Sequence, residues 1–161
     1  MSEPQIVATV QNVIHETGIS PGSLKLEITE TMIMDNQHDL TPVLHALRKS
    51  GIVLCMDDFG TGHSSLSCLH RFPIDVLKID QAFIDTMEHK IDFTAITQAI
   101  VMIAHTLKMQ VVAEGIETTA QLAQLQALDC DYGQGYYFAK PLSVQDAEAF
   151  ISTPPSHAKS A

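Results

Sequence analysis

Several short apolar runs in this chain have, at or near their end, a polar residue that could take part in chemistry. Residues 53–56 form such a run, and two adjacent carboxylates follow it. Because side chains alternate along a strand, Asp57 is expected on the face of Cys55, and Asp58 on the other face or in a loop. The polar residues placed in this way are Glu27, Asp57, Asp58, Lys78, Glu114 and Gln134.

Most of these side chains are carboxylates, and a cluster that is rich in oxygen and free of thiolates suits Mg²⁺ or Mn²⁺. Two such ions, bridged by a carboxylate, can hold a phosphodiester and activate a water for in-line attack. Asp57 is the natural bridge, because its neighbour Asp58 can serve the second ion. Lys78 among carboxylates would stay protonated, and it could orient the nucleophile or neutralise developing charge.

A second chemistry fits the same spacing. A lysine carried on a strand, with acids nearby, is also the arrangement of a Schiff-base aldolase. The spacing alone does not separate the two, whereas trapping with borohydride and a carbonyl substrate would.

The elements that must position these residues alternate between strand and helix. A leading helix over residues 2–17 is followed by five strand–helix units at the spacing of βαβ segments. The strands are expected at residues 24–29, 53–56, 75–80, 110–114 and 132–136, and the later helices at 39–49, 64–70, 92–108, from Thr118 onward and from Ser143 onward.

Such alternation predicts an α/β fold with a parallel sheet. An open sheet concentrates its site at one switch point, whereas a barrel gathers residues from many strand ends around one mouth. The polar strand ends therefore favour a (β/α)8 TIM-type barrel. Five strands cannot close eight, so we expect an incomplete barrel. No internal repeat is visible.

Length and composition indicate one domain, which we place at residues 2–151, followed by a polar tail at 152–161 that we expect to be disordered. A formal net charge of -10 argues against unaided binding of DNA or of an anionic membrane. No apolar run approaches a membrane span, and three widely spaced cysteines suit a reducing compartment. We expect a cytoplasmic protein.

Five motifs follow one another along the chain: Leu-Glu-Ile-Thr-Glu at 26–30, Asp-Asp-Phe-Gly-Thr-Gly at 57–62 with Ser-Ser-Leu at 64–66, Leu-Lys-Ile-Asp at 77–80, Ala-Glu-Gly-Ile-Glu at 113–117 and Gly-Gln-Gly-Tyr at 133–136. In this order they resemble the EAL domain, a family of bacterial cyclic di-GMP phosphodiesterases. The resemblance implies a (β/α)8-type barrel, two Mg²⁺ or Mn²⁺ ions, and hydrolysis of cyclic di-GMP to linear pGpG.

By the same resemblance, Glu27, Asp57 and Asp58 are expected as metal ligands, with Asp57 bridging the ions. Lys78 would position or activate the water, with Glu114 and Gln134 as further site residues. The segment that couples substrate, metal and dimerisation would comprise Glu30, Phe59, Gly60, Thr61, Gly62, Ser64 and Ser65. Asp80 and Glu117 are expected in supporting roles, and for Glu117 a helix cap is an equal alternative.

The chain departs from the family pattern at its beginning. The glutamate of the Glu-Ala-Leu motif and an asparagine ligand from the next strand have no counterpart here. We therefore expect about the last 60% of such a domain, weak or inactive as a phosphodiesterase alone, with open strand edges that favour self-association as a homodimer. The alternatives are a non-catalytic module that binds cyclic di-GMP or a protein, and a fragment with no role of its own.

Overall fold

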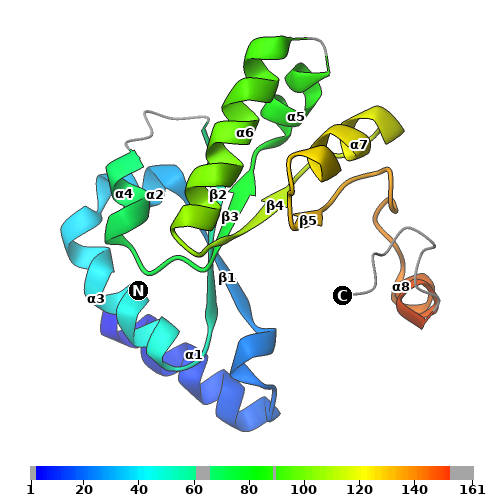
Figure 1. Cartoon of the computed structure of the whole chain (residues 1–161). Coiled ribbons are helices and arrows are strands. Elements are labelled where there is room, and N and C mark those ends of the chain that lie inside the picture. The colour runs from blue at the N-terminus through cyan, green and yellow to red at the C-terminus, as the bar shows by residue number, and fades with distance from the viewer. Residues whose placement is uncertain (1–2, 61–65, 89, 153–161) are drawn as a thin grey trace.

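The computed structural model describes residues 3–60, 66–88 and 90–152. Its five strands form one parallel sheet in the order β1-β2-β3-β4-β5, which is also their order along the chain (Figure 1). The strands are β1 (Lys25–Thr29), β2 (Val53–Phe59), β3 (Val76–Ile79), β4 (Gln110–Ala113) and β5 (Tyr132–Gly133). An order without reversal is that of a barrel wall, because a doubly wound sheet reverses at its switch point.

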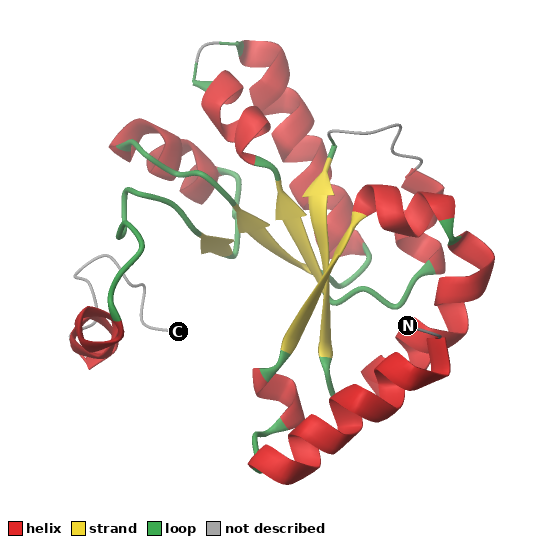
Figure 2. Cartoon of the chain, turned by 180° about the vertical axis from the view of Figure 1, so that it is seen from behind, coloured by secondary structure: helices red, strands yellow, loops and turns green. Residues whose placement is uncertain are grey.

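Helices connect the successive strands and flank the sheet, as Figure 2 shows from behind. α1 packs along α3, and the amide of Gln11 donates a hydrogen bond to the Ser50 hydroxyl at 2.8 Å. α8 stands apart from the sheet in both views. The helices are α1 (Glu3–Thr17), α2 (Glu30–Asp35), α3 (Gln37–Lys49), α4 (Leu66–Arg71), α5 (Gln81–Met87), α6 (Ile91–Thr106), α7 (Thr119–Ala127) and α8 (Val144–Ser152), with a 3-10 turn at Pro21–Ser23.

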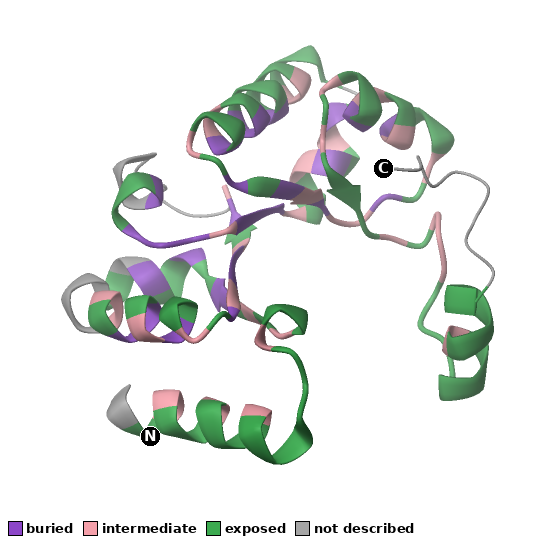
Figure 3. Cartoon of the chain, turned by 60° about the horizontal axis from the view of Figure 1, so that its bottom comes forward, coloured by how far each residue is buried: buried purple, intermediate pink, exposed green. Residues whose placement is uncertain are grey.

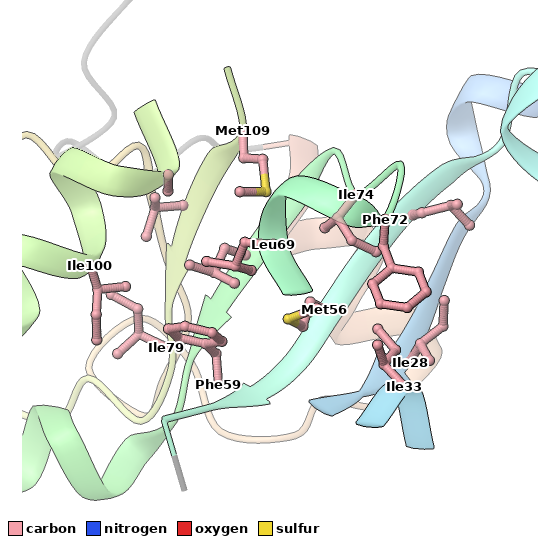
Figure 4. Close-up of a cluster of buried hydrophobic side chains, with 14 of the residues drawn as sticks. Ile28, Ile33, Met56, Phe59, Leu69, Phe72, Ile74, Ile79, Ile100 and Met109 are labelled. Carbon is pink, nitrogen blue, oxygen red and sulfur yellow. The ribbon is translucent and has the colours of Figure 1, made fainter. Parts of the chain in front are cut away.

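The two faces of the sheet have different environments. One face packs against the helices and carries the hydrophobic core, which Figures 3 and 4 show as buried ribbon and as side chains. Its strand residues include Ile28, Leu54, Met56, Leu77, Ile79 and Val111. The other face carries the alternate positions, with Glu27, Cys55 and Lys78 around a cavity of about 250 Å³. The apolar side therefore anchors the strands while the polar side faces the barrel interior.

The expected elements are largely confirmed, with differences at strand and helix ends. β2 continues to Phe59 instead of ending at Met56, and β5 has only two residues. Two short helices, α2 and α5, lie where no helix was expected. In each case the residue that lies between the strand and the helix, or ends the strand, caps the helix with its side chain. Thr29 accepts a hydrogen bond from the Met32 amide, and Asp80 accepts one from the Ala82 amide. Six or seven residues are too few to show helical periodicity.

Within the described part of the chain, no helix combines the length and the apolar character that crossing a bilayer requires. The expected disordered tail lies outside the described residues, apart from Ser152, which ends α8.

Candidate active site

Lys78 is the centre of the site. Its ammonium lies 2.8 Å from a Glu114 oxygen, 2.9 Å from a Glu27 oxygen and 3.1 Å from an Asp57 oxygen. The lysine comes from β3, and its three partners come from β1, from β2 and from the end of β4. Four of the residues expected at the barrel mouth are thus brought together by the fold.

The electrostatics of Lys78 favour its charged form. Burial opposes the charge, but the hydrogen bonds with Glu114, Glu27 and Asp57 outweigh it and hold the pKa of Lys78 above its ordinary value. The lysine is therefore an ammonium at neutral pH. A Schiff-base lysine needs the opposite shift, because only the free amine attacks a carbonyl. The aldolase chemistry that the spacing left open is not supported by this environment.

Strand register explains why these side chains meet. Glu27 pairs with Cys55, and Cys55 pairs in turn with Val76 on β3. Counting two residues onward along each strand stays on the same face, and this gives Asp57 on β2 and Lys78 on β3. The long lysine side chain then lies between the carboxylates of its neighbours.

A bulge separates the two adjacent aspartates. Met56 pairs with Leu77, but Phe59 pairs with Ile79, so β2 contains one extra residue at this point. Asp58 has a φ of 56°, in the left-handed region that Asp tolerates better than most residues. Its side chain is exposed, whereas Phe59 returns to the core. The bulge therefore lets the strand present one carboxylate to Lys78 and the next to solvent.

Glu30 holds the chain where it leaves β2. Its side chain is 2% exposed, and one carboxylate oxygen accepts the Gly60 amide at 3.0 Å. Gly60 has a φ of 98°, and a Cβ there would lie 2.6 Å from the Phe83 ring, so only glycine fits. Of the expected coupling segment, Thr61, Gly62, Ser64 and Ser65 lie outside the described residues.

A cavity of about 460 Å³ opens beside the lysine centre, at the carboxyl ends of β3 to β5. Glu114 contacts Lys78 and also lines this cavity. Asp80, Glu117 and Gln134, which were expected from the sequence, line it too. Asp80 also caps α5, and the backbone amide of Glu117 donates to the Gln121 side chain. The cap of α7 is Thr118, so the capping role considered for Glu117 falls to its neighbour.

Two further lining residues, Gln81 and Tyr136, were not expected. Gln81 packs against Gly115, where a Cβ would collide with its side chain. Gln81 directly follows the motif residue Asp80, and Tyr136 is the last residue of the Gly-Gln-Gly-Tyr motif. Their position next to a motif or within one is the signal that could have found them.

The donor set fits a hard divalent cation in kind, because every carboxylate at Lys78 supplies oxygen and one ammonium cannot balance three of them. In the described residues, however, no three His, Cys, Asp or Glu side chains are arranged as a ready metal site. The carboxylates converge on the Lys78 ammonium instead. Glu27 is the freest of them, with 52% of its side chain exposed. An ion would therefore require a carboxylate to turn away from the lysine.

Comparison with known proteins places this geometry in a family. The family model of the EAL domain matches residues 1–141. The chain belongs to the EAL domain family. It is 40% identical, over 94% of its length, to the cyclic di-GMP phosphodiesterase NbdA of Pseudomonas aeruginosa, of which it spans 19%.

Solved EAL domain structures share the fold. The phosphodiesterase PaMucR in complex with c-di-GMP superimposes with a TM-score of 0.83 at 38% identity, over 88% of this chain and 57% of that one. BlrP1 of Klebsiella pneumoniae, in a manganese and cyclic di-GMP complex, gives a TM-score of 0.81 at 33% identity, over 86% of this chain and 35% of that one. The expected fold, a partial TIM-type barrel, is confirmed.

Proposed function

We propose that this EAL domain chain binds cyclic di-GMP together with Mg²⁺ or Mn²⁺ and carries the lysine centre of a phosphodiesterase. The observation that supports this most directly is Lys78 held by three carboxylates from three strand ends. Two further facts agree: a solved relative holds manganese with the dinucleotide, and the 460 Å³ cavity adjoins the centre.

In this proposal, Glu27, Asp57 and Asp58 are the residues that would hold the divalent cations. The cations would lower the pKa of a bound water and neutralise phosphate charge. Lys78 keeps its proton and donates hydrogen bonds, so it orients the water or the phosphate oxygen without acting as a base. Glu114 fixes the lysine, and Gln134, whose backbone bonds to β4 and to Ile116, lines the cavity for the nucleotide.

We further propose that these residues alone turn the substrate over slowly or not at all. The sequence contains no Glu-Ala-Leu triplet to supply the remaining metal ligand. A site with fewer carboxylates binds a divalent cation more weakly. The second candidate function, a module that binds cyclic di-GMP without cleaving it, is favoured by the same observation and by the way the carboxylates converge on Lys78.

The deciding experiment separates binding from hydrolysis. Titration calorimetry with cyclic di-GMP and Ca²⁺ measures binding, and product formation with Mn²⁺ measures turnover, for the wild type, Asp57→Ala and the exposed control Glu16→Gln. We expect binding that only Asp57→Ala removes, with slow or no turnover. Failure of the wild type to bind contradicts the proposal. Rapid turnover that Asp57→Ala abolishes contradicts the expected inactivity and leaves the enzyme role intact.

Self-association is the last part of the proposal. β1 and β5 each pair with a single strand within the described residues, so each leaves one edge of the sheet open. Light scattering across a range of protein concentrations tests it. We expect a mass above that of the 17.6 kDa chain that falls on dilution, and a constant monomer mass contradicts the idea.

A further inference from the structure

At the end of the sheet opposite the lysine centre, Asp75 forms a clamp between β2 and β3. Its carboxylate accepts the Leu54 amide at 3.1 Å and contacts the Arg48 guanidinium at 2.9 and 3.0 Å. The Asp75 amide also donates to the Leu54 carbonyl at 2.9 Å. Asp75, which directly precedes β3, therefore binds both the backbone amide and the backbone carbonyl of Leu54 in β2.

The Asp131 side chain forms a similar arrangement between β4 and β5. One carboxylate oxygen accepts the Val111 amide at 2.8 Å and lies 2.9 Å from His105 Nε2. As with Asp75, the aspartate immediately precedes a strand, and it binds the second residue of the strand before it. The cationic or neutral partner, His105, lies in the last turn of α6, as Arg48 lies in the last turn of α3.

The helix ends show that the resemblance between the two clamps is geometric. α3 and α6 are each followed, after one capping residue, by a residue of positive φ, Gly51 at 86° and Lys108 at 63°. The helix residue that contacts the aspartate, Arg48 or His105, comes three positions before the residue of positive φ. It comes six positions before the strand residue whose amide the aspartate binds. Ile52 and Met109, which precede β2 and β4, have no side chain that could form such a clamp.

The clamps stand at a fixed distance from the site. The two clamps join Leu54 with Asp75 and Val111 with Asp131, and each of these residues is followed, three positions later, by a residue of the candidate site. The four site residues reached in this way are Asp57, Lys78, Glu114 and Gln134. A parallel strand rises about 3.3 Å per residue, so each clamp lies about 10 Å below the residue it serves.

We propose that Asp75 and Asp131 are positioning residues that fix the register of two strand pairs and thereby the geometry of the lysine centre. The clamp at Asp75 sets Asp57 against Lys78, and the clamp at Asp131 sets Glu114 against Gln134. This role for the site rests on the proposed function, whereas the register effect does not. Loss of one clamp loosens its own strand pair and leaves the other pair unchanged.

The test compares Asp75→Ala and Asp131→Ala with the conservative variants Asp75→Asn and Asp131→Asn. An asparagine oxygen can still accept the strand amide, so it should rescue the function that alanine loses. Val43→Ala, in α3, serves as a control that lowers global stability and leaves both clamps in place. Hydrogen exchange of single amides is read by NMR, and cyclic di-GMP affinity is read in Ca²⁺.

For Asp131→Ala we expect the Gln134 amide, which donates to the Ala113 carbonyl at 2.8 Å, to exchange about tenfold faster, with Leu54 unchanged. For Asp75→Ala we expect the Leu54 amide to exchange faster and the Gln134 amide to be unchanged. Affinity should fall about tenfold in both alanine variants, recover in the asparagine variants, and hold in Val43→Ala.

Uniform acceleration of all amides, or an equal affinity loss in Val43→Ala, would overturn the proposal. If the wild type does not bind cyclic di-GMP, the proposed function fails and exchange alone decides the register effect. Faster exchange of Gln134 only in Asp131→Ala then supports the clamp, and unchanged exchange overturns it.

Discussion

At the scale of single residues, Lys78 carries the most information. Strand alternation, which places every second residue on one face, predicts its position and its partners. Those three carboxylates then favour its protonated form. The sequence was therefore sufficient to predict that Glu27, Asp57, Lys78 and Glu114 meet. Alternation could not predict the bulge at Asp58, because the extra residue in β2 depends on how β2 pairs with β3.

Replacing Lys78 by Met should destabilise the folded chain. The substitution leaves partly buried carboxylates without their counter-charge, and losing one partner of such a contact costs about 1–3 kcal/mol. Because the folded-state pKa of Lys78 is raised, its contribution is complete below the ordinary lysine pKa of about 10.4 and is lost as pH rises through the higher folded value.

Urea unfolding at several pH values measures this effect. The gap between wild type and Lys78→Met should stay constant from about pH 7 to pH 10 and narrow above that range. Lys49→Met, at an exposed position of α3, should change the midpoint little. A gap that closes between pH 7 and pH 10 would contradict the raised pKa.

Gly60 gives a second prediction at this scale. Alanine there must adopt a φ of 98° and press its Cβ against Phe83, so we expect a loss of about 1–3 kcal/mol in unfolding free energy. Gly22→Ala is the matched control, because its Cβ would meet nothing nearer than 4.0 Å. Trimming the ring with Phe83→Leu should recover part of the loss. Equal midpoints for the two glycine variants would show that the close approach has no energetic weight.

At the scale of elements, the long helices were predictable and the short ones were not. The helix expected from Thr118 onward is confirmed as α7, and Thr118 and Gln121 form a capping box at its start. α2 and α5 were missed because Thr29 and Asp80 look like strand residues until the strand is known to stop. Nor could the paired clamps be seen, because they join residues about 20 apart through contacts that leave no periodic pattern.

Lys108→Gly should stabilise the chain by about 1 kcal/mol, because glycine adopts the left-handed conformation without the penalty of a Cβ. The Met109 amide donates to the Ala104 carbonyl across this turn at 2.9 Å, which fixes the conformation at the end of α6. Thermal and urea unfolding measure the gain. Lys90→Gly, at the other end of α6 with ordinary φ, should not raise stability, and a gain there as large as at Lys108 would point to charge instead.

At the scale of the whole molecule, family membership and barrel topology could be predicted because the motifs recur at strand ends in a fixed order. The position of α8 could not be predicted, because the sequence from Ser143 onward indicates a helix but not what the helix packs against. In the structure α8 has no buried residue (Figure 3). The net charge of -10 acts at this scale as well, since any cation will screen it to some degree.

Mn²⁺ should stabilise the folded chain by binding at the lysine centre, beyond what general screening provides. At about 100 times its Kd, a ligand of the folded state alone adds about 2.7 kcal/mol, which calorimetry detects as a higher Tm that EDTA reverses. NaCl at the same ionic strength measures screening by itself. Asp57→Asn removes a carboxylate from the centre, and Glu16→Gln removes the same charge from an exposed position of α1. We expect Mn²⁺ to raise the Tm of Glu16→Gln as it does the wild type, and to raise that of Asp57→Asn no more than NaCl does. An equal rise in both variants would mean that the carboxylates of the centre do not hold the ion and that the acidic surface alone accounts for the effect.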